Sequence, residues 1–114
     1  GMKTIFSRIM DGELPGDFVY RDDEIVAIRD IAPAAPVHIL IIPKKPITSL
    51  HHLEPEDAEL VGRMLLVTKR VAEQEGLERG YRVIINTGEE GGQTVPHLHF
   101  HLLGGRRLSE KMLA

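Results

Sequence analysis

Apolar residues recur along the chain with two different spacings, one typical of strands and one typical of helices. Alternating or short continuous apolar runs predict five strands, over residues 18–20, 25–31, 37–42, 81–85 and 97–103. A spacing of three to four residues predicts a short helix over 4–11 and a long helix that begins near Pro55 and ends at Gly76. The polar residues 21–24, between the first two strands, are typical of a hairpin connection.

Two of these segments carry more apolar residues than a half-buried element needs. Residues 37–42 are almost continuously apolar, which is expected of a central strand covered on both faces, and His38 is their one polar member. The long helix has a second apolar stripe formed by Val61, Leu65, Thr68 and Ala72. This stripe indicates either contact with a partner subunit or a broad contact with the core.

The composition excludes several function classes. The 114 residues fit a single domain, 1–114, with one site, although Gly1 before Met2 is interpreted as a tag remnant and left out of the fold. A net charge of −3 provides no basic surface, so no nucleic-acid partner is expected. The absence of cysteine excludes thiol catalysis and fits a reducing compartment. The longest apolar run is far shorter than the ~20 residues of a membrane span, and no signal peptide is recognisable, so we expect a cytoplasmic protein without membrane contact.

Three histidines, His97, His99 and His101, alternate with apolar residues in the last predicted strand. Because side chains on a strand alternate between its faces, this period predicts one face of histidines and one of core residues. The first and third would lie ~13 Å apart, too far for all three to bind one ion through bonds of ~2 Å. A neighbouring pair could share a metal, but no carboxylate lies on the strand to complete a ligand set. We therefore expect neither a metal nor another cofactor, and a metal-binding β-protein is the third alternative.

Nucleophilic catalysis at phosphorus fits the histidine face better. Imidazole has an unperturbed pKa of ~6.5 and can form a covalent intermediate, and His99 is the natural candidate because His97 and His101 flank it. The preceding loop contains Gly88, Gly91 and Gly92, which would free backbone amides to face an anion, and Gln93 and Thr94 add side-chain donors. The loop has neither the lysine nor the following helix of a P-loop, so the catalysis is expected to be metal-independent.

Other residues have both a functional and a structural interpretation. Asp30 could accept the hydroxyls of a ribose, or it could be a turn residue before Pro33. His38 could orient the histidine face or be a hydrogen-bonded core residue, whereas the pair His51 and His52 is expected to be solvated. An apolar slot for a base, or simply part of the core, could be formed by Ile5, Phe6, Ile9 and Ile31.

The motifs around the histidines resemble those of one known family. The run His97-Leu98-His99-Phe100-His101-Leu102-Leu103 is similar to the signature of the histidine triad superfamily. The flanking residues 91–96 and 104–106, together with 35–45 upstream, resemble its nucleotide-binding branch. The likeness extends from Thr4 to about Arg106. It implies an α+β fold whose antiparallel sheet continues across a homodimer.

The resemblance also implies an activity, the hydrolysis of purine nucleoside phosphoramidates or aminoacyl adenylates to the nucleoside monophosphate. His99 would be the nucleophile that becomes nucleotidylated and His101 would contact the phosphate, while His97 and His38 would support the hydrogen-bond network. Asp30 and Ile31 would lie on the ribose and base side. The residues implied around the phosphate and ribose are Asn86, Gly92, Gln93 and Thr94.

Two departures from the family pattern bear on specificity. Pro46 stands where the branch often has a histidine, and residues 108–114 replace a tail that usually carries a tryptophan and prolines. Because that tail helps to shape the leaving-group side, the preference for an amine or an acyl group is left undetermined. Two rival functions remain: hydrolysis of dinucleoside polyphosphates or nucleotidyl transfer within the same superfamily, and a nucleotide-responsive interaction module.

Overall fold

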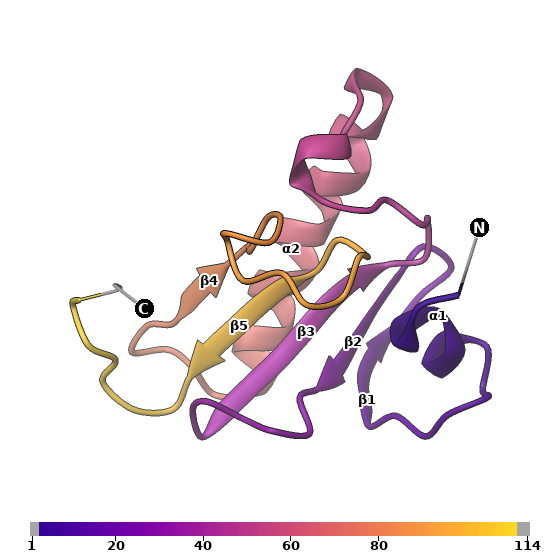
Figure 1. The fold of residues 1–114 in the computed structure, drawn as a ribbon. Coiled ribbons are helices and arrows are strands. Elements are labelled where there is room, and N and C mark those ends of the chain that lie inside the picture. The colour runs from indigo at the N-terminus through magenta and orange to yellow at the C-terminus, as the bar shows by residue number, and fades with distance from the viewer. Residues whose placement is uncertain (1–2, 112–114) are drawn as a thin grey trace.

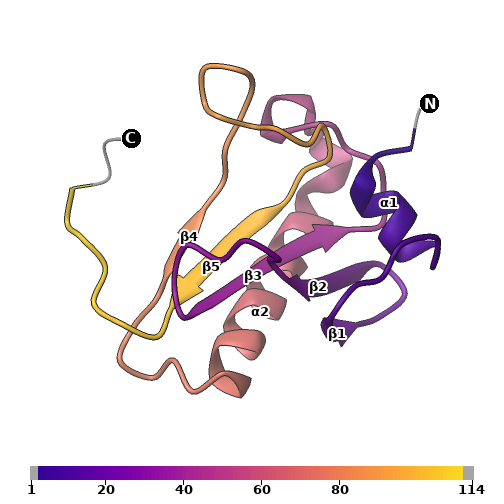
Figure 2. The same cartoon turned by 60° about the horizontal axis from the view of Figure 1, so that its bottom comes forward.

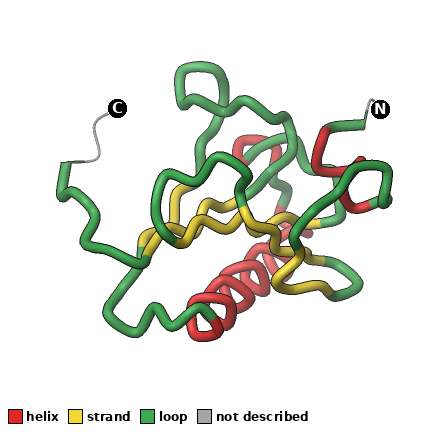
Figure 3. Tube along the Cα trace, turned by 90° about the horizontal axis from the view of Figure 1, so that it is seen from below, coloured by secondary structure: helices red, strands yellow, loops and turns green. Residues whose placement is uncertain are grey.

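The computed structural model describes residues 3–111. The predictions for Gly1 and for the end of the tail, residues 112–114, therefore fall outside the described residues. The described chain forms one five-stranded sheet with a long helix on one face (Figures 1 and 3). The strands are β1 (Phe18–Arg21), β2 (Ile25–Arg29), β3 (Val37–Pro43), β4 (Arg82–Ile84) and β5 (Phe100–Gly104). The helices are α1 (Ile5–Met10) and α2 (Ala58–Gln74), with 3-10 turns η1 (Leu50–His52) and η2 (Pro55–Asp57).

All neighbouring strands are antiparallel, in the order β1-β2-β3-β5-β4. This arrangement confirms the predicted α+β class, the five strands, and the one short and one long helix. The predicted hairpin joins β1 to β2, and the Asp22 carboxylate closes it by accepting the amides of Glu24 and Ile25 at 2.7 and 2.8 Å. No helix within residues 3–111 is long and apolar enough to cross a bilayer.

The apolar residues of the sheet form two cores, one on each face. On the α2 face, Ile39 and Ile41 pack with Phe100, Leu102 and residues of α2. On the other face, Phe6 of α1 packs on the second cluster, which is formed by Val26, Ile28, Leu40 and Ile42. β3 contributes to both cores, so the prediction of a central strand covered on both faces is confirmed.

Two predicted strands are shorter in the structure. The strand predicted over 25–31 ends at Arg29, because the Asp30 carboxylate accepts the Ala32 amide at 2.8 Å and turns the chain before Pro33. The strand predicted over 97–103 begins only at Phe100. The preceding amides leave the sheet ladder, since Leu98 N donates to Ile47 O at 2.7 Å and His97 N donates to Val95 O at 2.8 Å. The long connection between β4 and β5 projects beyond the sheet (Figure 2).

The remaining boundaries differ by a few residues. The long helix opens with the 3-10 turn η2, and Gly76, whose φ is +74°, follows its end. Leu65 and Leu66 on α2 are 51% and 66% exposed, and β4 is an edge strand. An exposed apolar face and a free sheet edge are compatible with a homodimer whose sheet continues through a second copy, but they do not test it. The homodimer therefore stays a prediction.

Candidate active site

The histidines lie on the sheet face opposite α2. His101 pairs with Leu40 across β3 and β5, so the two side chains share that face, while Leu98 and Phe100 are buried in the α2-side core. The ring centroids of His99 and His101 are 4.9 Å apart, and those of His38 and His101 are 5.2 Å apart. The predicted alternation between core and histidine face therefore holds, although the segment before Phe100 is not regular strand.

His99 has its tautomer set by the backbone. Its Nδ1 lies 2.7 Å from the carbonyl oxygen of His97, and a carbonyl can only accept, so Nδ1 carries the proton. The lone pair of the neutral ring is therefore on Nε2. Burial lowers the pKa of His99, with a smaller opposing effect from the hydrogen bond to His97. The result is a buried, neutral imidazole with an unprotonated Nε2.

His97 anchors the carbonyl on which His99 depends. Its Nε2 donates to Pro43 O at 2.7 Å, and burial lowers the pKa of this ring as well. The peptide unit that supplies the His97 carbonyl is also held through its N–H, since Leu98 N donates to Ile47 O at 2.7 Å. Hydrogen bonds at both ends of one peptide unit polarise each other, so the acceptor for His99 is both oriented and strengthened.

His38 and His101 form a directed hydrogen-bond chain. The amide of Ala34 donates to His38 Nδ1 at 3.0 Å, so the proton of the neutral His38 ring is on Nε2. His38 Nε2 lies 2.9 Å from His101 Nδ1, which must then accept, leaving the proton of His101 on its own Nε2. Burial, and then the neighbouring His99 and His38 rings, lower the pKa of His101 to about 4. His101 is thus a neutral ring that offers an Nε2–H donor.

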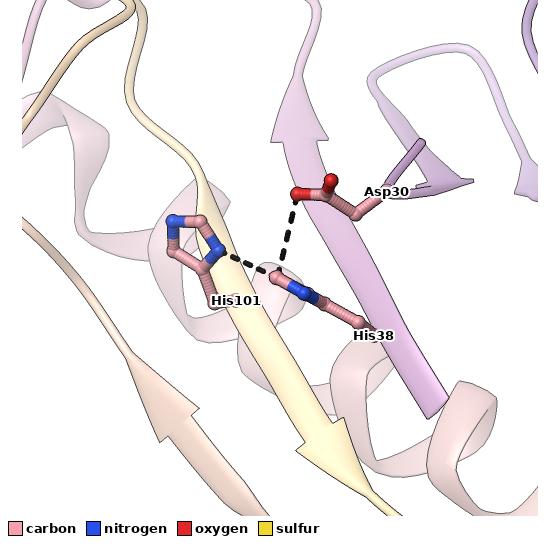
Figure 4. A group of neighbouring side chains, drawn as sticks. All are labelled: Asp30, His38 and His101. Atoms are coloured by element: carbon pink, nitrogen blue, oxygen red, sulfur yellow. Dashed lines mark hydrogen bonds and ion pairs between the residues drawn. The ribbon is translucent and has the colours of Figure 1, made fainter. Parts of the chain in front are cut away.

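Asp30, His38 and His101 have the composition of a metal-binding triad (Figure 4). Within residues 3–111 they are the one such group found, with ligand atoms all within 4.8 Å of one another. A metal on His38 Nε2 would require the ring proton on Nδ1, where it would face the Ala34 N–H. The residues therefore do not fit a metal in this hydrogen-bond arrangement. Asp30 Oδ2 instead lies 3.5 Å from His38 Nε2, beside the hydrogen-bond chain.

The glycine loop before the histidines, residues 88–93, uses three of its backbone amides in hydrogen bonds within the loop. Gly88 and Gly92 have φ values of +73° and +79°, a conformation that favours glycine. The amides of Gly88 and Gly92 donate within the loop, contrary to the expectation that they face an anion, and the Gln93 amide also donates within the loop. The side chain of Gln93 is also bonded to backbone atoms, whereas Thr94 is exposed between the loop and His97. Asn86 lies partly exposed just after β4.

The residues predicted to hold a base divide into two groups. Phe6 and Ile9 belong to the second cluster, and the Phe6 ring packs edge-on to His99 with centroids 4.8 Å apart. Ile31 is 97% exposed beside Asp30, and Ile5 is 46% exposed on α1. Phe6 is therefore a core residue that also buries the candidate nucleophile, while Ile31 is left free to contact a ligand. As predicted, His51 and His52 are exposed.

Nothing in the residue pattern indicates the backbone groups that orient the histidines. Ala34 contributes an amide, and Pro43 and Ile47 contribute carbonyls. Every residue type has these groups, so only their placement by the fold makes them part of the site.

Comparison with known proteins identifies the family of this chain. The HIT domain family matches residues 11–108. A purine nucleoside phosphoramidase of Escherichia coli (strain K12) is 52% identical over 107 residues, which cover 93% of this chain and 90% of that protein. A 14 kDa zinc-binding protein of Brassica juncea is 47% identical over 108 residues, covering 93% of this chain and 96% of that protein. The solved structure of a HIT family hydrolase from Legionella pneumophila Philadelphia 1 has a TM-score of 0.92 at 45% identity, with 95% and 97% of the two chains covered. The chain therefore belongs to the HIT family.

Proposed function

We propose that this HIT protein is a hydrolase that cleaves purine nucleoside phosphoramidates or aminoacyl adenylates to the nucleoside monophosphate. The observation that carries the proposal is the 2.7 Å contact between His99 Nδ1 and the His97 carbonyl, which leaves an unprotonated Nε2 on a buried neutral ring. The 52% identical relative named as a purine nucleoside phosphoramidase supports the substrate class.

In the proposed reaction, His99 Nε2 attacks the α-phosphorus in line with the leaving group. A bond forms between Nε2 and phosphorus, and the bond from phosphorus to the amine nitrogen or acyl oxygen breaks; a leaving amine takes up a proton from solvent, whereas a leaving carboxylate needs none. Water then attacks the phosphorus of the nucleotidyl-histidine, loses a proton to solvent, and releases the nucleoside monophosphate with His99 restored. The His97 carbonyl accepts a hydrogen bond from Nδ1–H throughout the reaction. This bond stabilises the positive charge that develops on the ring in the first step.

The neighbouring groups would bind the rest of the nucleotide. The Nε2–H of His101 would donate to a phosphate oxygen that gains charge, with His38 holding its orientation. Thr94 and Asn86 would contact the phosphate and ribose, and Asp30 Oδ2 would accept the ribose hydroxyls. Exposed Ile31 would pack against the purine.

The activity is tested by assaying adenosine phosphoramidate and diadenosine polyphosphates side by side with the purified protein. We expect the kcat/KM for AMP release from the phosphoramidate to be at least roughly tenfold higher than that for cleavage of the diadenosine polyphosphates. This ratio corresponds to about 1.4 kcal/mol of transition-state discrimination. Faster cleavage of the diadenosine compounds would favour the rival hydrolase. Nucleotide binding without cleavage of either compound would favour an interaction module.

The lowered histidine pKa values predict activity that persists in mild acid. The reactive form of His99 is the neutral ring, and burial holds its pKa below the usual ~6.5. The acid limb of the kcat/KM profile should therefore be centred below pH 6.5, with less than half of the activity lost between pH 7.5 and 6.5. The profile is measured from pH 4.5 to 8 with subtraction of the uncatalysed hydrolysis. A limb centred at or above pH 6.5 would contradict the assignment.

A further inference from the structure

The side-chain amide of Gln93 connects three backbone segments around the histidines. Its Nε2 donates to Thr48 O at 2.8 Å and to Val95 O at 3.0 Å. Its Oε1 accepts the amide of Gly88 at 3.0 Å. Both amide protons are therefore engaged, and neither can reach a phosphate oxygen unless one of these bonds is broken.

The first connection closes the glycine loop. The backbone amide of Gln93 donates to Gly88 O at 3.0 Å, while the Gly88 amide donates back to the Gln93 side chain. Gly88 and Gln93 thus join the two ends of the loop through a reciprocal pair of bonds. A third bond inside the loop, from Gly92 N to Glu89 O at 3.0 Å, helps to define its shape.

The other two connections reach the catalytic segment. Val95 O, which accepts from Gln93, also accepts the amide of His97 at 2.8 Å. Thr48 follows Ile47, whose carbonyl holds the Leu98 amide. The backbone of residues 47–48 therefore supports the segment 93–98 at two points, and Gln93 supplies one of them. A single side chain couples the loop, this support and the turn that leads to His97.

We propose that Gln93 is a positioning residue that holds the glycine loop and the turn at Val95 in place, and that it is not a ligand of the phosphate. The proposal rests on the proposed function for the location of the phosphate beside His99. Gln93 then acts indirectly: it holds the backbone next to Thr94, the residue that the proposed function assigns to the phosphate and ribose. The bonds that set the His99 tautomer do not involve Gln93, so its loss affects substrate binding more than the chemical step.

The test compares Gln93→Met with Gln74→Met. Methionine has a similar length and cannot form the three bonds, and Gln74 is an exposed residue at the end of α2, so it serves as the control. In the ligand-free protein, hydrogen exchange of the Gly88 amide should be roughly tenfold faster in Gln93→Met and unchanged in Gln74→Met. With adenosine phosphoramidate at 25 °C, KM should rise roughly tenfold while kcat falls less than about threefold.

Each outcome decides between defined alternatives. Exchange at the wild-type rate in ligand-free Gln93→Met, together with a raised KM, would overturn the proposal and make Gln93 a phosphate ligand. Faster exchange with an unchanged KM would also overturn it, because the bonds would then serve stability alone. The exchange measurement uses no substrate. A wild-type protein that cleaves no phosphoramidate would therefore refute the proposed function, but it would leave intact the inference that Gln93 holds the loop in place.

Discussion

Turnover is expected to fall by at least about 10⁴-fold when His99 is replaced by asparagine, whereas AMP still binds. The asparagine amide can donate to the His97 carbonyl in place of Nδ1–H, so the local backbone keeps its partner. It has no counterpart of the Nε2 lone pair, so the covalent step is lost. Single-turnover release of AMP measures the chemistry, and calorimetric titration with AMP measures binding.

His51→Asn is the matched control for this variant. His51 is an exposed histidine in η1, so its replacement should leave both AMP binding and turnover at the wild-type level. Release of AMP by His99→Asn at more than about a hundredth of the wild-type rate would show that His99 is not the nucleophile. Loss of AMP binding in that variant would show instead that His99 mainly holds the ligand.

The largest expected effect on stability comes from Phe100, the residue between two of the site histidines. Its ring is 1% exposed in the core on the α2 face, away from the imidazoles. Phe100→Ala should lower the free energy of unfolding by about 3–5 kcal/mol, a large share of the roughly 5–15 kcal/mol typical of a domain. Chemical denaturation monitored by circular dichroism measures the loss.

Phe100→Leu separates the removal of volume from the loss of the aromatic ring. It keeps most of the buried apolar surface, so it should cost less than about 1.5 kcal/mol. Under conditions where the protein remains folded, it should also bind AMP as the wild type does. A cost below about 1 kcal/mol for Phe100→Ala would mean that the ring is not a core residue, contrary to its burial.

Much of the fold is predictable because burial imposes periods on the sequence. The alternation that places Phe100 in the core and His101 on the other face follows from strand geometry, and the structure agrees. The same alternation does not require ladder bonds, so it could not reveal that His97 lies outside β5. The amide that follows it binds Ile47 O instead, and such a contact depends on the arrangement of segments about 50 residues apart.

The polar residues of the site were predictable in kind but not in their partners. The sequence predicts that Asp30 either turns the chain or accepts ribose hydroxyls, and its two oxygens do different things: Oδ1 accepts the Ala32 amide, and Oδ2 lies beside His38. The sequence predicts side-chain donation from Gln93 to an anion, yet both of its amide protons are donated to backbone carbonyls. The residue type specifies which bonds can form, whereas the fold decides which of them do.

The two-faced stretch from His97 to Leu103 has a consequence for how such a protein can change during evolution. Three of its apolar members, Leu98, Phe100 and Leu102, fill the core next to α2 and its histidines face the other way, so the same few residues serve both folding and chemistry. A deletion or insertion of one residue within this stretch would reverse the faces of the side chains on one side of the change, sending imidazoles into the core or leucines into the site. The length of this stretch is therefore as constrained as its composition.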